Sequence, residues 1–177
     1  MYKQDIILLS GSHFDKDITA RIAEDIKTVY GCKVLFKDCS LDVYSYYNPG
    51  RRQYDANNIM EAVLKANPLE AKKRIGLFSV DLFIPVLTYI FGQAELNGNV
   101  GIASLYRLKN ELYGLEQDKE LLHERFRKVV IHEIGHTYGL LHCHSPSCVM
   151  RSSTYVEDLD QKSLHLCNKC RQDIEKT

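Results

Sequence analysis

Short apolar runs and amphipathic segments alternate along the first half of the chain. Residues 5–10 contain four consecutive apolar positions and predict a buried strand, and residues 15–30 repeat apolar side chains at helical spacing. The same alternation continues with an expected strand at 32–37, a loop at 41–48, a helix at 52–65 and a strand at 74–80. Strands that alternate with helices predict an α/β fold, in which helices pack on a twisted and mostly parallel sheet.

The pattern changes after residue 81. Two strand-like runs, 89–95 and 100–105, are joined by a turn that contains Asn97-Gly98, a strong hairpin signal. One of these strands must therefore run antiparallel to its neighbour, at an edge of the sheet. An edge strand beside a cleft can bind an extended peptide by main-chain pairing. The residues expected to form such a substrate rim are Phe91, Gly92, Gln93 and Ala94. An ordinary hairpin without a binding role explains the same pattern.

A long amphipathic helix is expected from about Asp118 to Gly139. Its apolar side chains recur at helical spacing: Leu122, Phe126, Val130, Ile134 and Tyr138. Ile134 lies roughly 200° around the helix from His132, so the apolar stripe packs on the core while His132 faces a cleft. The segment 143–177 is rich in cysteine and is expected to form a loop that ends in a short helix at about 168–176.

Charge and composition argue against several classes of function. The 23 basic and 23 acidic side chains give a formal net charge of zero, so no long-range field attracts nucleic acid or an anionic membrane. The N-terminus lacks a signal-peptide pattern, and no apolar run reaches the ~20 residues that span a bilayer, which predicts a cytoplasmic protein. In that reducing compartment the six cysteines are expected to be metal ligands or free thiols rather than disulfides.

The long helix carries the most informative pattern of the chain, HExxHxxGxxH, which starts at His132. His132 and His136 lie one turn apart on the same helix face, and Gly139 allows the chain to turn back so that His142 reaches the same point. Three neutral imidazoles leave a fourth position for water, which is the arrangement of a catalytic zinc. Zinc lowers the pKa of bound water toward ~7, and Glu133 would accept its proton as general base and pass it to the leaving amine. The pattern predicts hydrolysis of peptide bonds.

A purely structural explanation of these residues is weaker. By the residue frequencies of this chain, the extended motif arises by accident in roughly 4 of 100,000 such sequences, against roughly 2 of 100 for HExxH alone. Ordinary helix histidines would also leave Glu133 and His142 without a role. Gly135, inside the helix, costs up to ~1 kcal/mol relative to alanine, which indicates that this position needs space or a close backbone approach.

A second metal site is predicted by four cysteines with the spacing C-x4-C and C-x2-C: Cys143, Cys148, Cys167 and Cys170. Four thiolates at such spacing form closed tetrahedral zinc sites, which are structural. The site would stabilise a tail with few apolar residues, and because Cys143 follows His142 it would brace that ligand of the catalytic zinc. Two alternatives remain open. His144 could replace Cys143 as a ligand, or the pair Cys167 and Cys170 could have a redox role.

The remaining candidates have weaker patterns. Met150 follows the histidine motif closely, and composition alone would make it an ordinary core residue. Cys32 and Cys39 are most simply free or buried thiols. The histidines outside the motifs are expected to be surface or satisfied side chains: His13, His123 and His165.

The sequence resembles the archaemetzincins, a branch of the metzincin peptidases, through the motif at His132, Met150 and the four cysteines. The pattern of that family is HExxHxxGxxxCxxxxCxM followed by CxxC. This chain departs from it in the sixteen residues between Met150 and Cys167, where about seventeen are expected. The resemblance implies a metzincin-like α/β (α+β) fold, with Met150 in a methionine turn beneath the metal and residues 91–94 as the substrate-binding edge strand.

The resemblance also implies one metallopeptidase domain over residues 1–177. An upper subdomain, 1–139, would carry the active-site helix, and a small zinc-stapled subdomain, 140–177, would carry the four cysteines. Two zinc ions per chain are implied, one catalytic and one structural, and no zymogen segment. The partners would be peptide or protein substrates, without nucleic acid or membrane, and we expect a monomer.

The cleavage preference is left open by this resemblance, since aminopeptidase-like activity is proposed for only some members. A competing hypothesis is a catalytically silent, zinc-stabilised adaptor that retains the metal site. Screening for peptide cleavage separates the two.

Overall fold

The computed structural model describes residues 5–39, 41–66 and 73–176. Its strands are β1 (Ile6–Ser10), β2 (Val34–Asp38), β3 (Tyr47–Asn48), β4 (Gln53–Asp55), β5 (Lys73–Phe78), β6 (Leu82–Phe83), β7 (Gly92–Ala94) and β8 (Val100–Ser104). Its α-helices are α1 (Lys16–Tyr30), α2 (Ala56–Ala66), α3 (Lys119–Thr137), α4 (Val156–Gln161) and α5 (Asn168–Glu175). None of the helices in these ranges is both long and apolar enough to cross a membrane.

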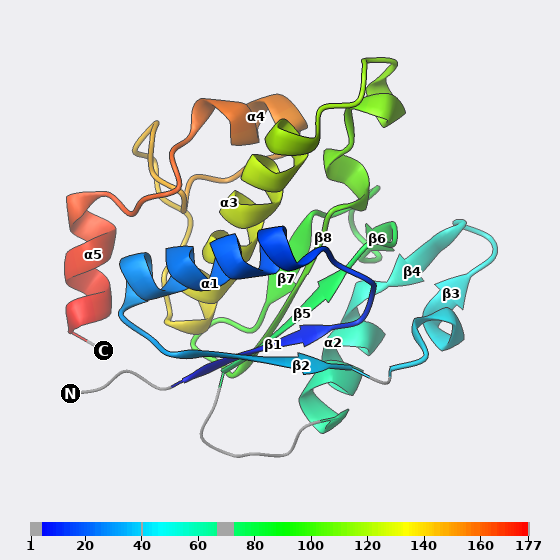
Figure 1. Cartoon of the computed structure of the whole chain (residues 1–177), viewed down its shortest axis with the longest axis horizontal. Helices are drawn as coiled ribbons and strands as arrows, with labels where there is room; N and C mark the ends of the chain where they lie inside the picture. Colours follow the sequence, from blue (N-terminus) through cyan, green and yellow to red (C-terminus); the bar gives the residue numbers. More distant parts are fainter. Residues whose placement is uncertain (1–4, 40, 67–72, 177) are drawn as a thin grey trace.

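Five strands form the central sheet in the order β2-β1-β5-β8-β7 (Figure 1). β2, β1, β5 and β8 run parallel, and β7 pairs antiparallel with β8 at one edge, with Gly92 opposite Ala103. Asn97 takes the left-handed conformation, with φ of 55°, in the turn between β7 and β8. The expected α/β fold with an antiparallel edge strand is therefore confirmed. A second, smaller sheet has the order β3-β4-β6.

Helices cover both faces of the central sheet because successive residues of a strand point to opposite sides. Ile6 and Leu8 of β1 pack with α1 and α3 in the larger apolar core, whereas Ile7 and Leu9 pack with α2 in the smaller one. Figure 1 shows α1 and α3 together on one face of the sheet, with α4 against α3, and α2 on the opposite face. Burial of these apolar side chains, worth ~25 cal/mol per Å², is the main source of stability.

The helix that carries the histidine motif, α3, has a defined residue at each end. The Asp118 carboxylate accepts a hydrogen bond of 2.9 Å from the N–H of Leu121 at the N-terminus. At the C-terminus Gly139 takes φ of +84°, and the N–H groups of Gly139 and Leu140 donate to the carbonyls of His136 and Gly135. This pair of bonds is a Schellman motif, which ends the helix and turns the chain back.

The expected helix at 52–65 is wrong in its first residues. Residues 53–55 form β4, and the helix begins at Ala56 because the Asp55 carboxylate accepts hydrogen bonds from the N–H groups of Asn57 and Asn58. The expected loop at 41–48 likewise contains a 3-10 turn at Val43–Tyr46 and the short strand β3.

The C-terminal segment contains one helix more than expected, α4. Its first turn is capped by Asp158, whose carboxylate accepts hydrogen bonds from the N–H groups of Thr154 and Tyr155. A helix of six residues is shorter than two turns, so the apolar period that predicts helices has no room to repeat. The expected final helix is present as α5.

Candidate active site and metal centres

Three histidines converge at the C-terminal end of α3. The Nε2 atoms of His132 and His136 lie 3.0 Å apart. His142 follows the turn at Gly139, and its ring centroid lies 5.3 Å from that of His132 and 5.0 Å from that of His136. One ring nitrogen of each histidine lies within 4.8 Å of the other two. The helix and the turn after it therefore direct all three side chains to one point.

Hydrogen bonds from the outer nitrogens orient two of the rings. Nδ1 of His132 lies 2.8 Å from the Val149 carbonyl oxygen, and Nδ1 of His136 lies 2.7 Å from that of Leu140. Because a carbonyl oxygen only accepts, each Nδ1 carries the proton and each Nε2 presents a lone pair. Burial lowers the pKa of all three motif histidines, which favours neutral imidazole rings. This donor set fits a zinc ion with three nitrogen ligands.

Glu133 is buried between α3 and the edge strand. Burial raises the pKa of its carboxyl to about 8, and the positive charge of Lys162 opposes that shift. A Cβ atom at Gly92 of β7 would lie 2.8 Å from Oε1 of Glu133 and 2.7 Å from the Ile102 carbonyl oxygen. Glycine at position 92 therefore allows the Glu133 carboxyl to lie against the edge strand.

Gly135 of α3 packs directly on Met150. A Cβ atom at Gly135 would overlap the Met150 sulfur and would lie 3.0 Å from its Cε and 3.2 Å from the Tyr30 hydroxyl oxygen. Met150 is fully buried in this position. The close approach expected from a glycine inside the helix is confirmed, and the approaching group is a side chain from the segment beneath the histidines.

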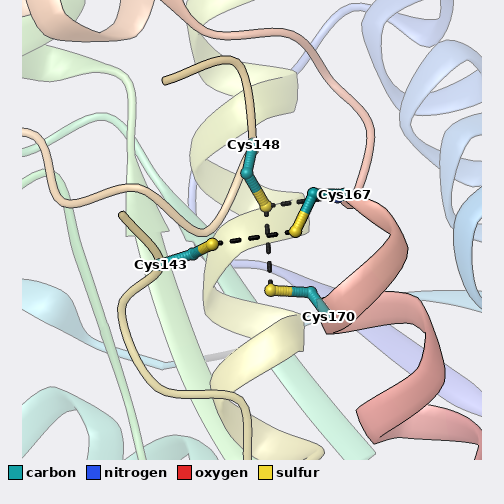
Figure 2. Close-up of side chains that lie close together, drawn as sticks. All are labelled: Cys143, Cys148, Cys167 and Cys170. Atoms are coloured by element: carbon teal, nitrogen blue, oxygen red, sulfur yellow. Dashed lines mark hydrogen bonds between the residues drawn. The ribbon is translucent and has the colours of Figure 1, made fainter. Parts of the chain in front are cut away.

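The four cysteines of the C-terminal segment surround one point (Figure 2). The Sγ atoms of Cys143 and Cys167 lie 3.7 Å apart, and those of Cys148 and Cys170 lie 3.8 Å apart. A tetrahedron with Zn–S bonds of about 2.3 Å has edges of about 3.8 Å, whereas the sulfur atoms of a disulfide lie about 2.0 Å apart. The cluster therefore has the dimensions of a zinc site with four thiolate ligands. His144 is exposed and does not belong to this cluster.

Backbone N–H groups already stabilise negative charge on two of these sulfur atoms. The N–H of Cys167 donates to Cys148 Sγ at 3.3 Å, and the N–H of Ser145 donates to Cys143 Sγ at 3.4 Å. A hydrogen bond from the Cys170 backbone lowers the pKa of Cys167 to about 7, whereas burial raises the pKa of Cys148 and of Cys170. A divalent cation would favour the thiolate form of all four side chains.

A three-residue segment connects the two candidate metal sites. Cys148 belongs to the cysteine cluster, and the carbonyl of the next residue, Val149, accepts the hydrogen bond from His132. The carbonyl of Met150 accepts a hydrogen bond of 2.9 Å from the Cys143 N–H. The cysteine cluster is therefore linked to His132 as well as to His142, which precedes Cys143. Only the second of these links can be inferred from the spacing of residues in the sequence.

A cleft of about 610 Å³ opens beside the histidines. Its lining includes β7, the loop before it, and residues 152–155. All four residues of the expected substrate rim line this cleft: Phe91, Gly92, Gln93 and Ala94. The three histidines and Glu133 line it too, and so does Lys162, which the sequence did not single out.

The other candidate side chains lie away from this cleft. His13 and His165 are exposed, as expected, while Cys39 is half-buried and Cys32 is buried. The expectation for His123 is wrong. Its ring is buried on α3, and its Nδ1 has no hydrogen-bond partner among the residues that the structure describes.

Sequence comparison matches the chain to a peptidase family. The chain matches the family model for Peptidase family M54 over residues 22–176. The archaemetzincin of Methanocaldococcus jannaschii is 35% identical to it over 164 residues, which cover 90% of this chain and 88% of that protein. The archaemetzincin of Pyrococcus horikoshii is 38% identical over 151 residues, or 83% of this chain and 80% of that protein.

Solved structures agree with these matches in fold as well as in sequence. The archaemetzincin of Methanopyrus kandleri superposes with a TM-score of 0.86 at 31% identity, over 98% of this chain and 94% of that one. A zinc-dependent peptidase of Methanocorpusculum labreanum superposes with a TM-score of 0.82 at 28% identity, over 96% of this chain and 99% of that one. The chain therefore belongs to peptidase family M54, the family of the archaemetzincins, and is a metallopeptidase.

Proposed function

We propose that the chain hydrolyses peptide bonds with a zinc ion held by three histidines, His132, His136 and His142, and with Glu133 as general base. The observation that carries this proposal is that the three ring nitrogens and the Glu133 carboxyl line the same cleft. A zinc ion with three histidine ligands keeps one position open to water, lowers the pKa of that water and polarises a carbonyl group. The zinc-dependent peptidase of Methanocorpusculum labreanum, which shares the fold, supports zinc as the metal.

Glu133 is suited to hold a proton between two steps of hydrolysis. A general base takes the proton of the attacking water and then passes it to the leaving amine. Burial raises the pKa of the Glu133 carboxyl to about 8, so its surroundings favour the protonated form that exists between the two transfers. The charge of Lys162 opposes that shift, and a zinc ion at the histidines would oppose it further and so favour the ionised form that is needed before the attack.

We further propose that the substrate lies along β7 as an extended peptide. In the described part of the central sheet β7 is an edge strand, paired on one side with β8. Main-chain hydrogen bonds to such an edge bind a peptide independently of its sequence and leave side-chain pockets to select among peptides. The edge lies beside Glu133, since a Cβ atom at Gly92 would lie 2.8 Å from Oε1 of that carboxyl.

A second, structural zinc is proposed at Cys143, Cys148, Cys167 and Cys170. Four thiolates complete a tetrahedral shell, so no position would remain for water or substrate. The contribution of this zinc to catalysis would be indirect, because it would hold the Val149 carbonyl that orients His132.

Removal and return of zinc tests this proposal. The purified protein is expected to contain two zinc ions, and brief chelation should remove the one at the histidines first, because four thiolates form the closed site. Cleavage of a peptide library, followed by mass spectrometry, should stop on chelation and recover when zinc is added. A zinc-loaded protein that cleaves no peptide would favour the adaptor hypothesis, and cleavage that persists without metal would contradict the proposal.

A further inference from the structure

Lys162 is a buried lysine at the wall of the cleft. It follows α4 directly and is only 3% exposed, yet its side chain lines the cleft together with Val129, Leu159 and Glu133. Val129 and Leu159 are buried apolar residues. Lys162 is therefore a buried lysine in the cleft that also holds the residues proposed for catalysis.

The ammonium group has few partners for a buried charge. Among the described residues its Nζ donates one hydrogen bond, of 2.7 Å to the Arg151 carbonyl oxygen, and no carboxylate oxygen lies within the 4.0 Å of an ion pair. Lys128, which is equally buried, shows the usual arrangement: its Nζ lies 2.6 Å from a Glu124 carboxylate oxygen and 3.0 Å from the Leu159 carbonyl oxygen. An ammonium group carries three N–H donors, so Lys162 retains donors for a ligand in the cleft.

The charges around Lys162 do not replace such a ligand. Glu133, Cys148 and Asp158 favour the charged ammonium group and Lys128 disfavours it, and neither carboxylate lies within ion-pair distance. Burying an ammonium group without a charged partner is costly, and a carboxylate that enters the cleft loses part of its own hydration. Binding of a carboxylate to the ammonium group would offset the free energy that each of the two groups loses with its hydration.

We propose that Lys162 forms a carboxylate-binding subsite of the cleft. The subsite would select peptides that place a carboxylate next to the scissile bond, either on an aspartate or glutamate side chain or at the C-terminus of the substrate. The inference rests on the proposed peptidase function, which places the subsite next to the scissile bond, but it concerns substrate recognition rather than the chemical step. A neutral side chain at this position would leave the ammonium group with the Arg151 carbonyl but without a charged partner, and that difference is what produces selectivity.

Equilibrium binding tests the subsite without depending on turnover. Zinc-loaded Glu133→Gln protein would be titrated with fluorescent, C-terminally amidated peptides that carry one glutamate at successive positions, each matched to a peptide with glutamine there. At one position the glutamate peptide should bind about tenfold or more tightly. A second arm compares free with amidated C-termini in the glutamine series. Preference in the first arm identifies a side-chain carboxylate, and preference in the second alone identifies a terminal one.

Substitution of Lys162 then shows whether this residue causes the preference for a carboxylate. Lys162→Met, which keeps the aliphatic stem, should abolish it, and Lys65→Met, at an exposed lysine of α2, should leave it intact. Equal binding of all matched pairs by the protein with Lys162 intact would overturn the inference, whether or not the variant folds. A preference that survives Lys162→Met in folded protein would also overturn it. Glutamate preference in a protein that cleaves no peptide would uphold the subsite and reject the peptidase function.

Discussion

The sulfur atom of Met150 lies so close to Gly135 that a Cβ atom on this glycine would overlap it. Gly135 lies between Glu133 and His136 on α3, and Met150 follows the carbonyl of Val149, which holds the ring of His132. The contact therefore sets the distance between the helix that carries the motif and the segment that connects the two candidate metal sites.

Gly135→Ala is predicted to destabilise the protein although alanine favours a helix. Helix propensity alone would stabilise the variant by up to ~1 kcal/mol, whereas forcing a methyl group against Met150 costs roughly 1–3 kcal/mol. Urea unfolding of the zinc-loaded protein shows whether the substitution lowers or raises the free energy of unfolding. In a Met150→Ala background, which lacks the overlapping sulfur, the same glycine substitution should cost less, although truncation of the buried Met150 is itself destabilising. A stabilised single variant would show that the contact does not constrain the helix.

Gly92→Ala is predicted to lower kcat for peptide cleavage while the zinc content stays unchanged. The new methyl group would lie 2.8 Å from Cγ and Oε1 of Glu133 and must displace that carboxyl. Gly101→Ala on β8 is a matched control, because its methyl group would meet the apolar atoms of Ala94 and Ile75 at 3.1 Å. Steady-state kinetics and metal analysis of both variants check the prediction. An unchanged kcat for Gly92→Ala would mean that the observed position of Glu133 is not required.

Loss of the cysteine cluster is predicted to impair the histidine site. Cys148→Ser should release the structural zinc and loosen the Val149 carbonyl that orients His132, so the affinity of the histidine site for zinc should fall by about 10- to 100-fold. Cys39→Ser, at a half-buried cysteine outside the cluster, should change neither zinc affinity. Competition with a chromophoric chelator measures the zinc affinity of both sites. A Cys148→Ser protein that binds zinc normally at its histidines would contradict the proposed link.

The preference for acidic peptides is predicted to decline above about pH 8. Burial lowers the pKa of Lys162 to about 8, so the ammonium form dominates below that pH and is lost above it. The groups that act on it are Glu133, Cys148, Asp158 and Lys128. The ratio of kcat/KM for matched glutamate and glutamine peptides isolates this titration, because both peptides use the same general base. A ratio that stays constant through the alkaline range would contradict the role of Lys162.

Elements with a strong local pattern could be predicted from the sequence. The apolar run of β1, the periodic helices α1 and α3, and the Asn97-Gly98 turn each contain their own signal. β4 and α4 do not, since they are three and six residues long. Their conformation depends on partners distant in sequence, because β4 pairs with β6 and α4 packs against α3.

The candidate site likewise contains parts that local sequence patterns predict and parts that they do not. Spacing alone brought together the three histidines and the four cysteines, because helix geometry and paired cysteines are local patterns. The contacts of Gly92 with Glu133 and of Val149 with His132 join separate elements, and no spacing encodes them. Lys162 was missed because a lysine after a short helix is ordinarily solvated, and its burial and its hydrogen bond to the Arg151 carbonyl depend on tertiary packing.

The most direct test of the account compares peptide cleavage by wild-type and Glu133→Ala proteins that each contain the full amount of zinc. Loss of a general base lowers a rate by roughly 10²- to 10⁴-fold, and the variant retains all seven proposed metal ligands. We expect a rate loss of that size with two zinc ions still bound. Cleavage at the wild-type rate by purified Glu133→Ala protein would contradict it.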